Sequence, residues 1–272
     1  MEILEEDVAV ETGENQIDFD FLEDRKTSTQ LKQEWAGKRT LVVLVRTEGE
    51  VDSDFSICGK KMIEWVAMAS CCCEQKVVDD ADAFEIAKTF AEDYENIAVL
   101  YGNTPLLKSE TFAQIMNYFS NEGLNVLQLP RGYVFKSEFL KTAKMILSQN
   151  ITNFGTDDFC VVDDATKLSL AFEKLNRRIL AYHKQNGVIL FGENTIFVDA
   201  DVEIEKGCVI YPNNVLKGKT YVGHNVVLQN GNYIADTILC EGVSVCQSYL
   251  ENSKIENRKR IGPFEKIINQ KI

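Results

Sequence analysis

Residues 209–222, with the sequence VIYPNNVLKGKTYV, decide the fold of the C-terminal part of this chain. Within them an apolar side chain occupies every sixth position, at Ile210, Leu216 and Val222. The same spacing extends outward on both sides, through Val198, Ile204, Leu228, Ile234, Cys240 and Cys246. An α-helix repeats every 3.6 residues and a strand every two, so neither requires a period of six. A hexapeptide repeat is typical of a β-helix, in which six residues form one flat side of a coil.

This repeat predicts a short left-handed parallel β-helix over residues 188–272, with the nine period-six side chains pointing inward. Turn formers between these positions suit the corners, as do polar or small residues two places before an inward position. The two sets are Gly207, Asn213, Asn214, Gly218 and Gly223, and Cys208, Asn214 and Thr220. A β-sandwich of short strands is the alternative, but it would not hold one phase over nine repeats. The phase breaks at Asn252, so we expect about three coils.

Residues 37–187 have the pattern of an α/β domain. The apolar runs Thr40–Val45 and Ile97–Tyr101 indicate strands buried on both faces, and Asn125–Leu129 indicates a third strand. Helical spacing indicates helices near 60–70, 82–93, 110–122, 137–147 and 165–186, with Ser109 as an N-cap and Gly123 and Gly187 as helix ends. Strands that alternate with helices predict a Rossmann-like domain with a parallel sheet.

Charge and hydropathy exclude several classes of partner. The formal net charge of −13 argues against nucleic acid and anionic membranes, because proteins bind both through clustered Lys and Arg. Residues 1–36 are acidic at their start and aperiodic, so we expect a solvated arm, in which Ile17, Phe19 and Phe21 are compatible with one short docking strand. No apolar run approaches the roughly 20 residues that span a bilayer, and no secretory segment opens the chain, so we expect a cytoplasmic protein.

The eight cysteines include the consecutive Cys71, Cys72 and Cys73. Neighbouring residues of a strand point to opposite faces, so Cys71 and Cys73 could share a metal ion while Cys72 could not. No C-x-x-C pair accompanies them. We therefore expect small buried side chains in a reduced protein, with metal binding as the weaker alternative.

A set of short segments has a recognisable pattern, at 177–179, His183, 186–188, 199–204, 209–212 and 217–220. These segments resemble the linker helix and first β-helix coils of one enzyme family, the bacterial bifunctional N-acetylglucosamine-1-phosphate uridyltransferase / glucosamine-1-phosphate acetyltransferase. In the α/β domain, residues 58–66 (CGKKMIEWV) resemble the family's G-K-P-M-I-E-x-V helix start. Residues 101–107 (YGNTPLL) resemble its G-D-T-P-L-L strand end. The resemblance implies a nucleotidyltransferase domain followed by a left-handed β-helix.

The resemblance also implies a set of site residues. The metal-binding Asp of the family's G-D-T-P-L-L motif corresponds to Asn103, and its second ligand, an Asn, corresponds to Asp163, so these two would hold Mg²⁺ if the protein is active. The candidates for contact with a nucleotide or nucleotide sugar are Arg46, Lys60, Gly102 and Thr104. The family's reaction joins a sugar 1-phosphate to the nucleotide α-phosphate and gives UDP-N-acetylglucosamine.

The loop after the first strand departs from the family. The family has a glycine-rich phosphate loop there, whereas residues 46–54 (RTEGEVDSD) keep one glycine and add four carboxylates. Carboxylates repel a triphosphate, so we expect weak or lost uridyltransferase activity. The alternative is a non-catalytic oligomeric scaffold or regulatory protein that binds a nucleotide sugar or an active relative.

The resemblance to the β-helix half reaches residues 261–264, where the family's later coils begin. Those later coils bind acetyl-CoA, so we expect no acetyltransferase activity. The family's habit implies a homo-oligomer, a trimer formed through the β-helix. His224 lies in an early repeat, and we expect a surface corner residue rather than a catalyst.

Overall fold

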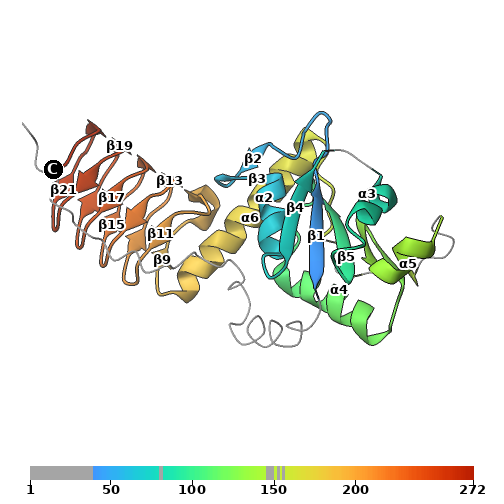
Figure 1. Cartoon of the computed structure of the whole chain (residues 1–272). Helices are drawn as coiled ribbons and strands as arrows, with labels where there is room; N and C mark the ends of the chain where they lie inside the picture. The colour runs from blue at the N-terminus through green and yellow to red at the C-terminus, as the bar shows by residue number, and fades with distance from the viewer. Residues whose placement is uncertain (1–38, 80–81, 145–149, 152–153, 155–156) are drawn as a thin grey trace, which may run out of the picture.

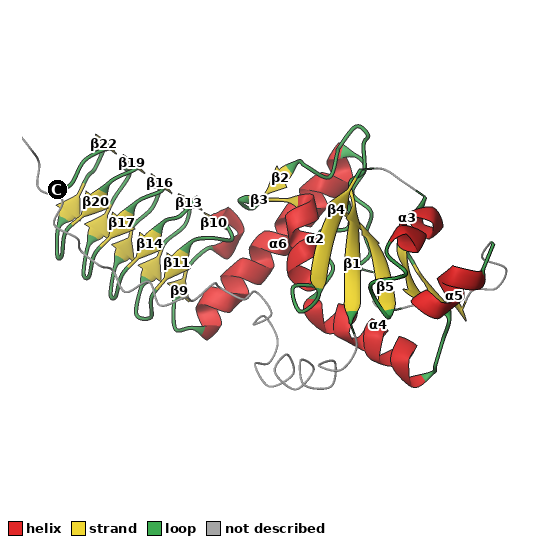
Figure 2. Ribbon diagram, viewed as in Figure 1, coloured by secondary structure: helices red, strands yellow, loops and turns green. Residues whose placement is uncertain are grey.

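The computed structural model describes residues 39–79, 82–144, 150–151, 154 and 157–272, and the acidic arm at 1–36 lies outside these ranges. An α/β domain is followed by a long helix and then by a β-helix (Figure 1). The long helix α6 (Ala165–Gln185) runs from one part to the other (Figure 2). Its N-terminus is capped by the Asp164 carboxylate, which accepts a hydrogen bond from the Lys167 amide at 2.8 Å.

The α/β domain contains a six-stranded sheet. Its order is β4 (Glu74–Val78), β1 (Thr40–Val45), β5 (Asn96–Tyr101), β7 (Gly132–Lys136), β6 (Val126–Leu129) and β8 (Asn150–Ile151). Strand β1 pairs in parallel with β4 and β5, whereas β7 is antiparallel to both β5 and β6. The predicted α/β fold is confirmed, but the sheet is mixed rather than purely parallel.

Helices cover both faces of this sheet. Successive residues of a central strand point to opposite faces, and because residues 41–45 of β1 are all apolar, both faces are buried. Val42 and Leu44 of β1 pack with α2 (Met62–Ala69) and α4 (Ser109–Asn121). Leu41 and Val43 pack with α3 (Ala83–Thr89) and α5 (Ser137–Thr142) on the other side. The predicted N-cap is wrong by one residue, because Ser109 is the first residue of α4 and Lys108 holds the cap position.

The C-terminal part consists of three parallel sheets with five, four and five strands, the arrangement of the predicted left-handed β-helix. The first sheet contains β10 (Phe197–Val198), β13 (Val215–Lys217), β16 (Tyr233–Ala235), β19 (Tyr249–Glu251) and β22 (Lys266–Ile268). The second contains β11 (Glu203–Ile204), β14 (Tyr221–Val222), β17 (Ile238–Leu239) and β20 (Lys254–Ile255). The third contains β9 (Ile189–Leu190), β12 (Val209–Ile210), β15 (Val227–Leu228), β18 (Ser244–Val245) and β21 (Arg260–Ile261). The solenoid is therefore longer than the three coils expected.

The inward register follows the sequence repeat only in its first part. The predicted inward side chains from Val198 to Ile234 are buried, which confirms them. Cys240 and Cys246 are wrong, because both are partly exposed and the neighbouring Leu239 and Val245 are fully buried instead. The corner between β16 and β17 is one residue shorter than the corresponding corner between β13 and β14, so the phase first moves back by one there. It moves back again before Leu250 and before Ile255, on either side of the predicted break at Asn252.

Of the polar residues predicted at the corners, Asn214 and Thr220 are buried and Asn213 is exposed, and Asn214 is bonded from coil to coil with Asn232 and Ser248. The Asn232 side-chain amide donates to Asn214 Oδ1 at 2.8 Å, and Asn232 Oδ1 accepts from the Ser248 amide at 3.0 Å. Such a ladder satisfies buried polar groups and fixes the stacking of the coils.

The first coil is attached to the α/β domain at two places. Asn176 of α6 donates to the Ile196 carbonyl at 2.8 Å and accepts from the Val198 amide at 3.0 Å. The hairpin of β2 (Ser56–Ile57) and β3 (Lys60–Lys61) reaches the coil from the other side, where the Cys58 carbonyl accepts from the Ala200 amide at 2.9 Å. Apolar side chains of both parts form one continuous core.

Candidate functional site

Four of the six predicted site residues lie at one edge of the α/β sheet. Strands β4, β1 and β5 are parallel, and β6 runs in the same direction as β5 because β7 is antiparallel to both. The carboxyl ends of these strands therefore meet at one edge, which is where open α/β sheets bind ligands. Arg46 follows β1 directly, and Gly102, Asn103 and Thr104 follow β5. We call this the carboxyl edge.

The turn after β5 is tightly packed. The Gly102 amide donates to the Val45 carbonyl at 2.9 Å, and a Cβ atom on Gly102 would lie 2.8 Å from Ser53 Cβ, so only glycine fits. Thr104 Oγ1 donates to the Tyr101 carbonyl at 2.9 Å. Asn103 is 6% exposed, and its Oδ1 atom is buried without a hydrogen-bond partner. A buried amide oxygen of this kind requires a donor from water or a ligand.

The loop at 46–54 is folded on itself. The Thr47 amide donates to Ser53 Oγ and the Ser53 amide to the Thr47 carbonyl, both at 3.0 Å. The Asp54 amide donates to Asp52 Oδ1 at 2.9 Å, and the Phe55 amide donates to the Asp52 carbonyl at 3.1 Å. These four amides are occupied within the loop and do not form a cradle for phosphates.

The cations beside this loop are paired with carboxylates of the chain itself. Arg46 Nη1 lies 3.3 Å from Asp79 Oδ1, and Arg46 Nε lies 3.7 Å from Asp54 Oδ2. Lys61 Nζ lies 3.0 Å from Asp54 Oδ1. The charge of Arg46 is therefore largely compensated at the carboxyl edge.

Lys60 lies elsewhere. It belongs to the β2–β3 hairpin, and its Nζ is 2.7 Å from Asp201 Oδ1 in the first coil of the β-helix. The structure thus places this residue at the domain junction rather than with Arg46 and Asn103.

Asp163 is brought next to Asn103, because the Val162 amide donates to the Asn103 carbonyl at 2.8 Å. Its carboxylate, however, holds Lys167 Nζ at 2.5 Å, and this hydrogen bond raises the pKa of the Lys167 ammonium. Lys167 Nζ also lies 3.5 Å from Asp164 Oδ2. Because Asp163 is paired to an ammonium and Asn103 supplies only a neutral amide oxygen, the two residues as folded do not fit a Mg²⁺ ion. Across the described residues, no group of three His, Cys, Asp or Glu side chains is placed to hold a metal.

One residue at the carboxyl edge was not predicted. Arg131 lies in the turn between β6 and β7, and its guanidinium carbon is 4.1 Å from the centroid of the Tyr101 ring. Its Nε atom is buried without a partner, as is Thr47 Oγ1. The sequence did contain a signal, since Arg131 follows the predicted strand 125–129 almost directly, as Arg46 follows the first strand.

The cysteine run is not buried, which corrects the expectation. Helix α2 ends at Ala69, and the chain then forms an exposed turn that contains Cys71 and Cys72, while Cys73 is half-buried. None of the eight cysteines, all of which lie in the described ranges, forms a disulfide. His224 is a partly exposed corner residue, as predicted, with Nε2 2.9 Å from Glu205 Oε2.

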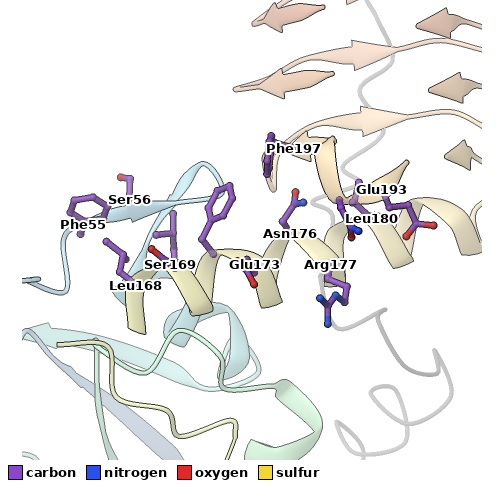
Figure 3. Close-up of a pocket in the computed structure, with 13 residues that line it drawn as sticks. Phe55, Ser56, Leu168, Ser169, Glu173, Asn176, Arg177, Leu180, Glu193 and Phe197 are labelled. Carbon is purple, nitrogen blue, oxygen red and sulfur yellow. The ribbon is translucent and has the colours of Figure 1, made fainter. Parts of the chain in front are cut away.

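A groove of about 680 Å³ lies between the β2–β3 hairpin, α6 and the first coil. Figure 3 shows Phe55 and Phe197 on opposite sides of it, with Leu168, Ser169 and Asn176 of α6 along its base. None of the six predicted site residues lines this groove. The part of the chain that the structure describes has no helix long and apolar enough to cross a membrane.

Comparison with known proteins gives one consistent relationship. The chain is similar to the bifunctional protein GlmU of Clostridium botulinum, with 34% identity over 127 residues, which cover 47% of this chain and 28% of that protein. Similarity to the GlmU protein of Streptococcus thermophilus is 40% over 106 residues, or 39% of this chain and 23% of the relative. The GlmU protein of Caldanaerobacter subterraneus subsp. tengcongensis aligns over 303 residues at 23% identity, covering 78% of this chain and 66% of the relative. The first two matches thus span about a quarter of the relatives' length.

No protein-family model matches the chain. Among solved structures, the molybdopterin-guanine dinucleotide biosynthesis protein A from Archaeoglobus fulgidus matches with a TM-score of 0.41 and 14% identity, over 51% of this chain and 99% of that one.

Proposed function

We propose that this GlmU-like chain binds a nucleotide or nucleotide sugar at its carboxyl edge, and that nucleotidyl transfer there is weak or lost. The relationship to the GlmU proteins supports a function of the sugar-nucleotidyltransferase kind. The observation that supports the loss of transfer is the self-bonded loop at 46–54, in which the amides of Thr47, Ser53 and Asp54 already donate to Ser53 Oγ, the Thr47 carbonyl and Asp52 Oδ1.

Nucleotidyl transfer depends on donors and cations that stabilise the charge of the triphosphate and its leaving group. Losing one such donor typically costs about 3–4 kcal/mol in the barrier, so losing several is expected to reduce turnover at least about a thousandfold. Glu48, Glu50, Asp52 and Asp54 add negative charge beside the approach of the phosphates. Asn103 and Asp163 do not fit a metal ion as folded, so the donors of the protein alone would have to stabilise the charge of the triphosphate.

The test is a pyrophosphate-release assay with UTP and CTP and a panel of sugar 1-phosphates, run beside ligand-induced shifts of the melting temperature. We expect shifts with nucleotides or nucleotide sugars and little or no pyrophosphate. Replacing Glu48 and Glu50 with Gln should strengthen nucleotide binding, whereas Glu122→Gln, an exposed carboxylate after α4, should not. Turnover of order 1–10 per second by the unaltered protein would show that another segment carries the phosphates.

A second candidate function, an oligomeric scaffold, is favoured by one face of the β-helix. Phe197, Val215, Tyr233 and Tyr249 lie in register on neighbouring strands of the first sheet, and none of them is fully buried. The rings of Tyr233 and Tyr249 stack at 4.9 Å. A contiguous apolar stripe of this kind is typical of a protein interface.

We therefore propose a cytoplasmic homotrimer formed through the β-helix, with neither nucleic acid nor membrane as a partner. Light scattering at micromolar concentration should give three times the chain mass of 30.8 kDa. A monomer that remains a monomer over a tenfold range of concentration would reject this proposal.

A further inference from the structure

We infer that Arg131 is the anion anchor of the carboxyl edge and binds a phosphate or diphosphate group of the ligand, with its guanidinium supported by the ring of Tyr101. The inference rests on the proposed function, because it names the residue that would hold the charged part of a nucleotide or nucleotide sugar. No motif of the sequence indicates Arg131, but the geometry and charge of the carboxyl edge do.

The backbone fixes where Arg131 lies. Gly132 pairs with Leu129 of β6 and with Leu100 of β5, so the turn that carries Arg131 is held at the level of the last residues of β5. A Cβ atom on Gly132 would lie 2.4 Å from the Val99 carbonyl oxygen, and Gly132 has a φ of +126°. Only glycine allows so close an approach. Arg131 is therefore held beside Tyr101, the residue that precedes Gly102 and Asn103 in the chain.

Charge distinguishes Arg131 from the other cations near this edge. Arg46 is paired with Asp79 and Asp54, and Lys61 is paired with Asp54 as well. For Arg131, no carboxylate of the described ranges lies within ion-pair distance. Its described partner is the Tyr101 ring, 4.1 Å from the guanidinium carbon. An aromatic face supports a guanidinium without neutralising its charge, and it leaves the in-plane N–H donors available.

Unpartnered polar atoms at the same edge indicate the chemistry of the ligand. Arg131 Nε is a buried donor without an acceptor, while Asn103 Oδ1 and Thr47 Oγ1 are buried without hydrogen-bond partners. A phosphate oxygen accepts from a guanidinium in the geometry that Arg favours, and hydroxyl groups of a sugar can donate to amide and hydroxyl oxygens. A sugar or nucleoside that carries a phosphate or diphosphate satisfies both requirements.

The experiment measures the affinity of the full chain for three probes, uridine diphosphate, cytidine diphosphate and inorganic pyrophosphate, by isothermal titration calorimetry. The variants are Arg131→Gln and Arg131→Lys, with Arg177→Gln as the matched control, because Arg177 lines the separate groove on α6. Melting curves confirm that each variant is folded. We expect Arg131→Gln to weaken binding about tenfold to a hundredfold, Arg131→Lys to weaken it less, and Arg177→Gln to leave it unchanged.

The outcomes separate this inference from the proposed function. Binding of nucleotides that is equal in the unaltered protein and in Arg131→Gln overturns the role of Arg131 and leaves the proposed function in place. Binding of pyrophosphate that depends on Arg131, without binding of either nucleotide, supports the anion anchor and overturns the proposed function. Absence of binding of all three probes by the unaltered protein overturns both.

Discussion

The two histidines of the chain offer a direct test of how α6 is buried. His183 is 3% exposed and its Nδ1 atom has no hydrogen-bond partner. Burial lowers the pKa of His183 to about 4, against about 6.5 in an unfolded chain. Between these two values the unfolded chain binds more protons than the folded one, so the free energy of unfolding must fall as the pH falls through this window.

The magnitude follows from the two pKa values. Lowering the pH from about 7.5 to about 5.5 should remove about 1.3 kcal/mol of stability through His183 alone. Carboxylates titrate near the lower end of this range, so the informative quantity is the difference between the protein and its His183→Phe variant, which keeps a ring beside Tyr182 and loses the titrating group.

The assay is urea denaturation at several pH values, with NMR titration of the histidine ring protons as an independent measure. His224→Gln is the control, because His224 is a partly exposed corner residue. Between about pH 7.5 and pH 5.5, the free energy of unfolding of His183→Phe should fall by about 1.3 kcal/mol less than that of the unaltered protein. His224→Gln should keep this contribution of His183. A measured pKa near 6.5 for His183, or an unchanged pH dependence in His183→Phe, would refute the reasoning.

Three further predictions concern the junction, the metal and the ladder. Gly59→Ala should destabilise the protein by about 2 kcal/mol more than Gly123→Ala in urea denaturation. Both glycines have positive φ, but only at Gly59 would a Cβ atom lie 2.8 Å from Asp199 Cβ. Millimolar Mg²⁺ should leave the melting temperature of the unaltered protein unchanged. It should raise the melting temperature of the Asn103→Asp, Lys167→Ala double variant. A rise in the unaltered protein that Asp163→Ala abolishes would instead show a metal site. Asn232→Ala should lower the free energy of unfolding by about 1–3 kcal/mol, because Asn214 Oδ1 and the Ser248 amide lose a hydrogen-bond partner. A loss smaller than half of the lower value would contradict a stabilising role of the ladder.

Sequence periodicity predicted the β-helix because inward positions must be apolar, yet it could not locate the first change of phase. Residues 238–240 are Ile, Leu and Cys, so each alternative register offers an apolar side chain, and only the length of the preceding corner decides between them. The cysteine run was misplaced for a related reason. Small apolar character predicts burial, but helix α2 ends at Ala69 and the following turn faces solvent.

At the site, the resemblance of residues 101–107 to the G-D-T-P-L-L motif indicated Gly102, Asn103 and Thr104, and the structure places all three at the carboxyl edge, directly after β5. Arg131 was missed because an antiparallel strand follows it directly, whereas the prediction considered only alternating strands and helices. Lys60 was assigned from a resemblance, and no local pattern shows that a two-stranded hairpin carries it to the β-helix.

We expect the protein to unfold as a single cooperative unit, because one apolar core joins the α/β domain to the β-helix. This core includes Val51 from the loop after β1, Trp65 from α2, Leu175 from α6 and the inward residues of the coils as far as Ile267. Unfolding of either part exposes apolar surface of the other, so calorimetry should record one transition rather than two. Because Val51 of the loop at the carboxyl edge belongs to the same core as the first coil, the packing of the loop depends on the packing of that coil. A ligand or partner that stabilises the β-helix should therefore also restrict the motion of Val51.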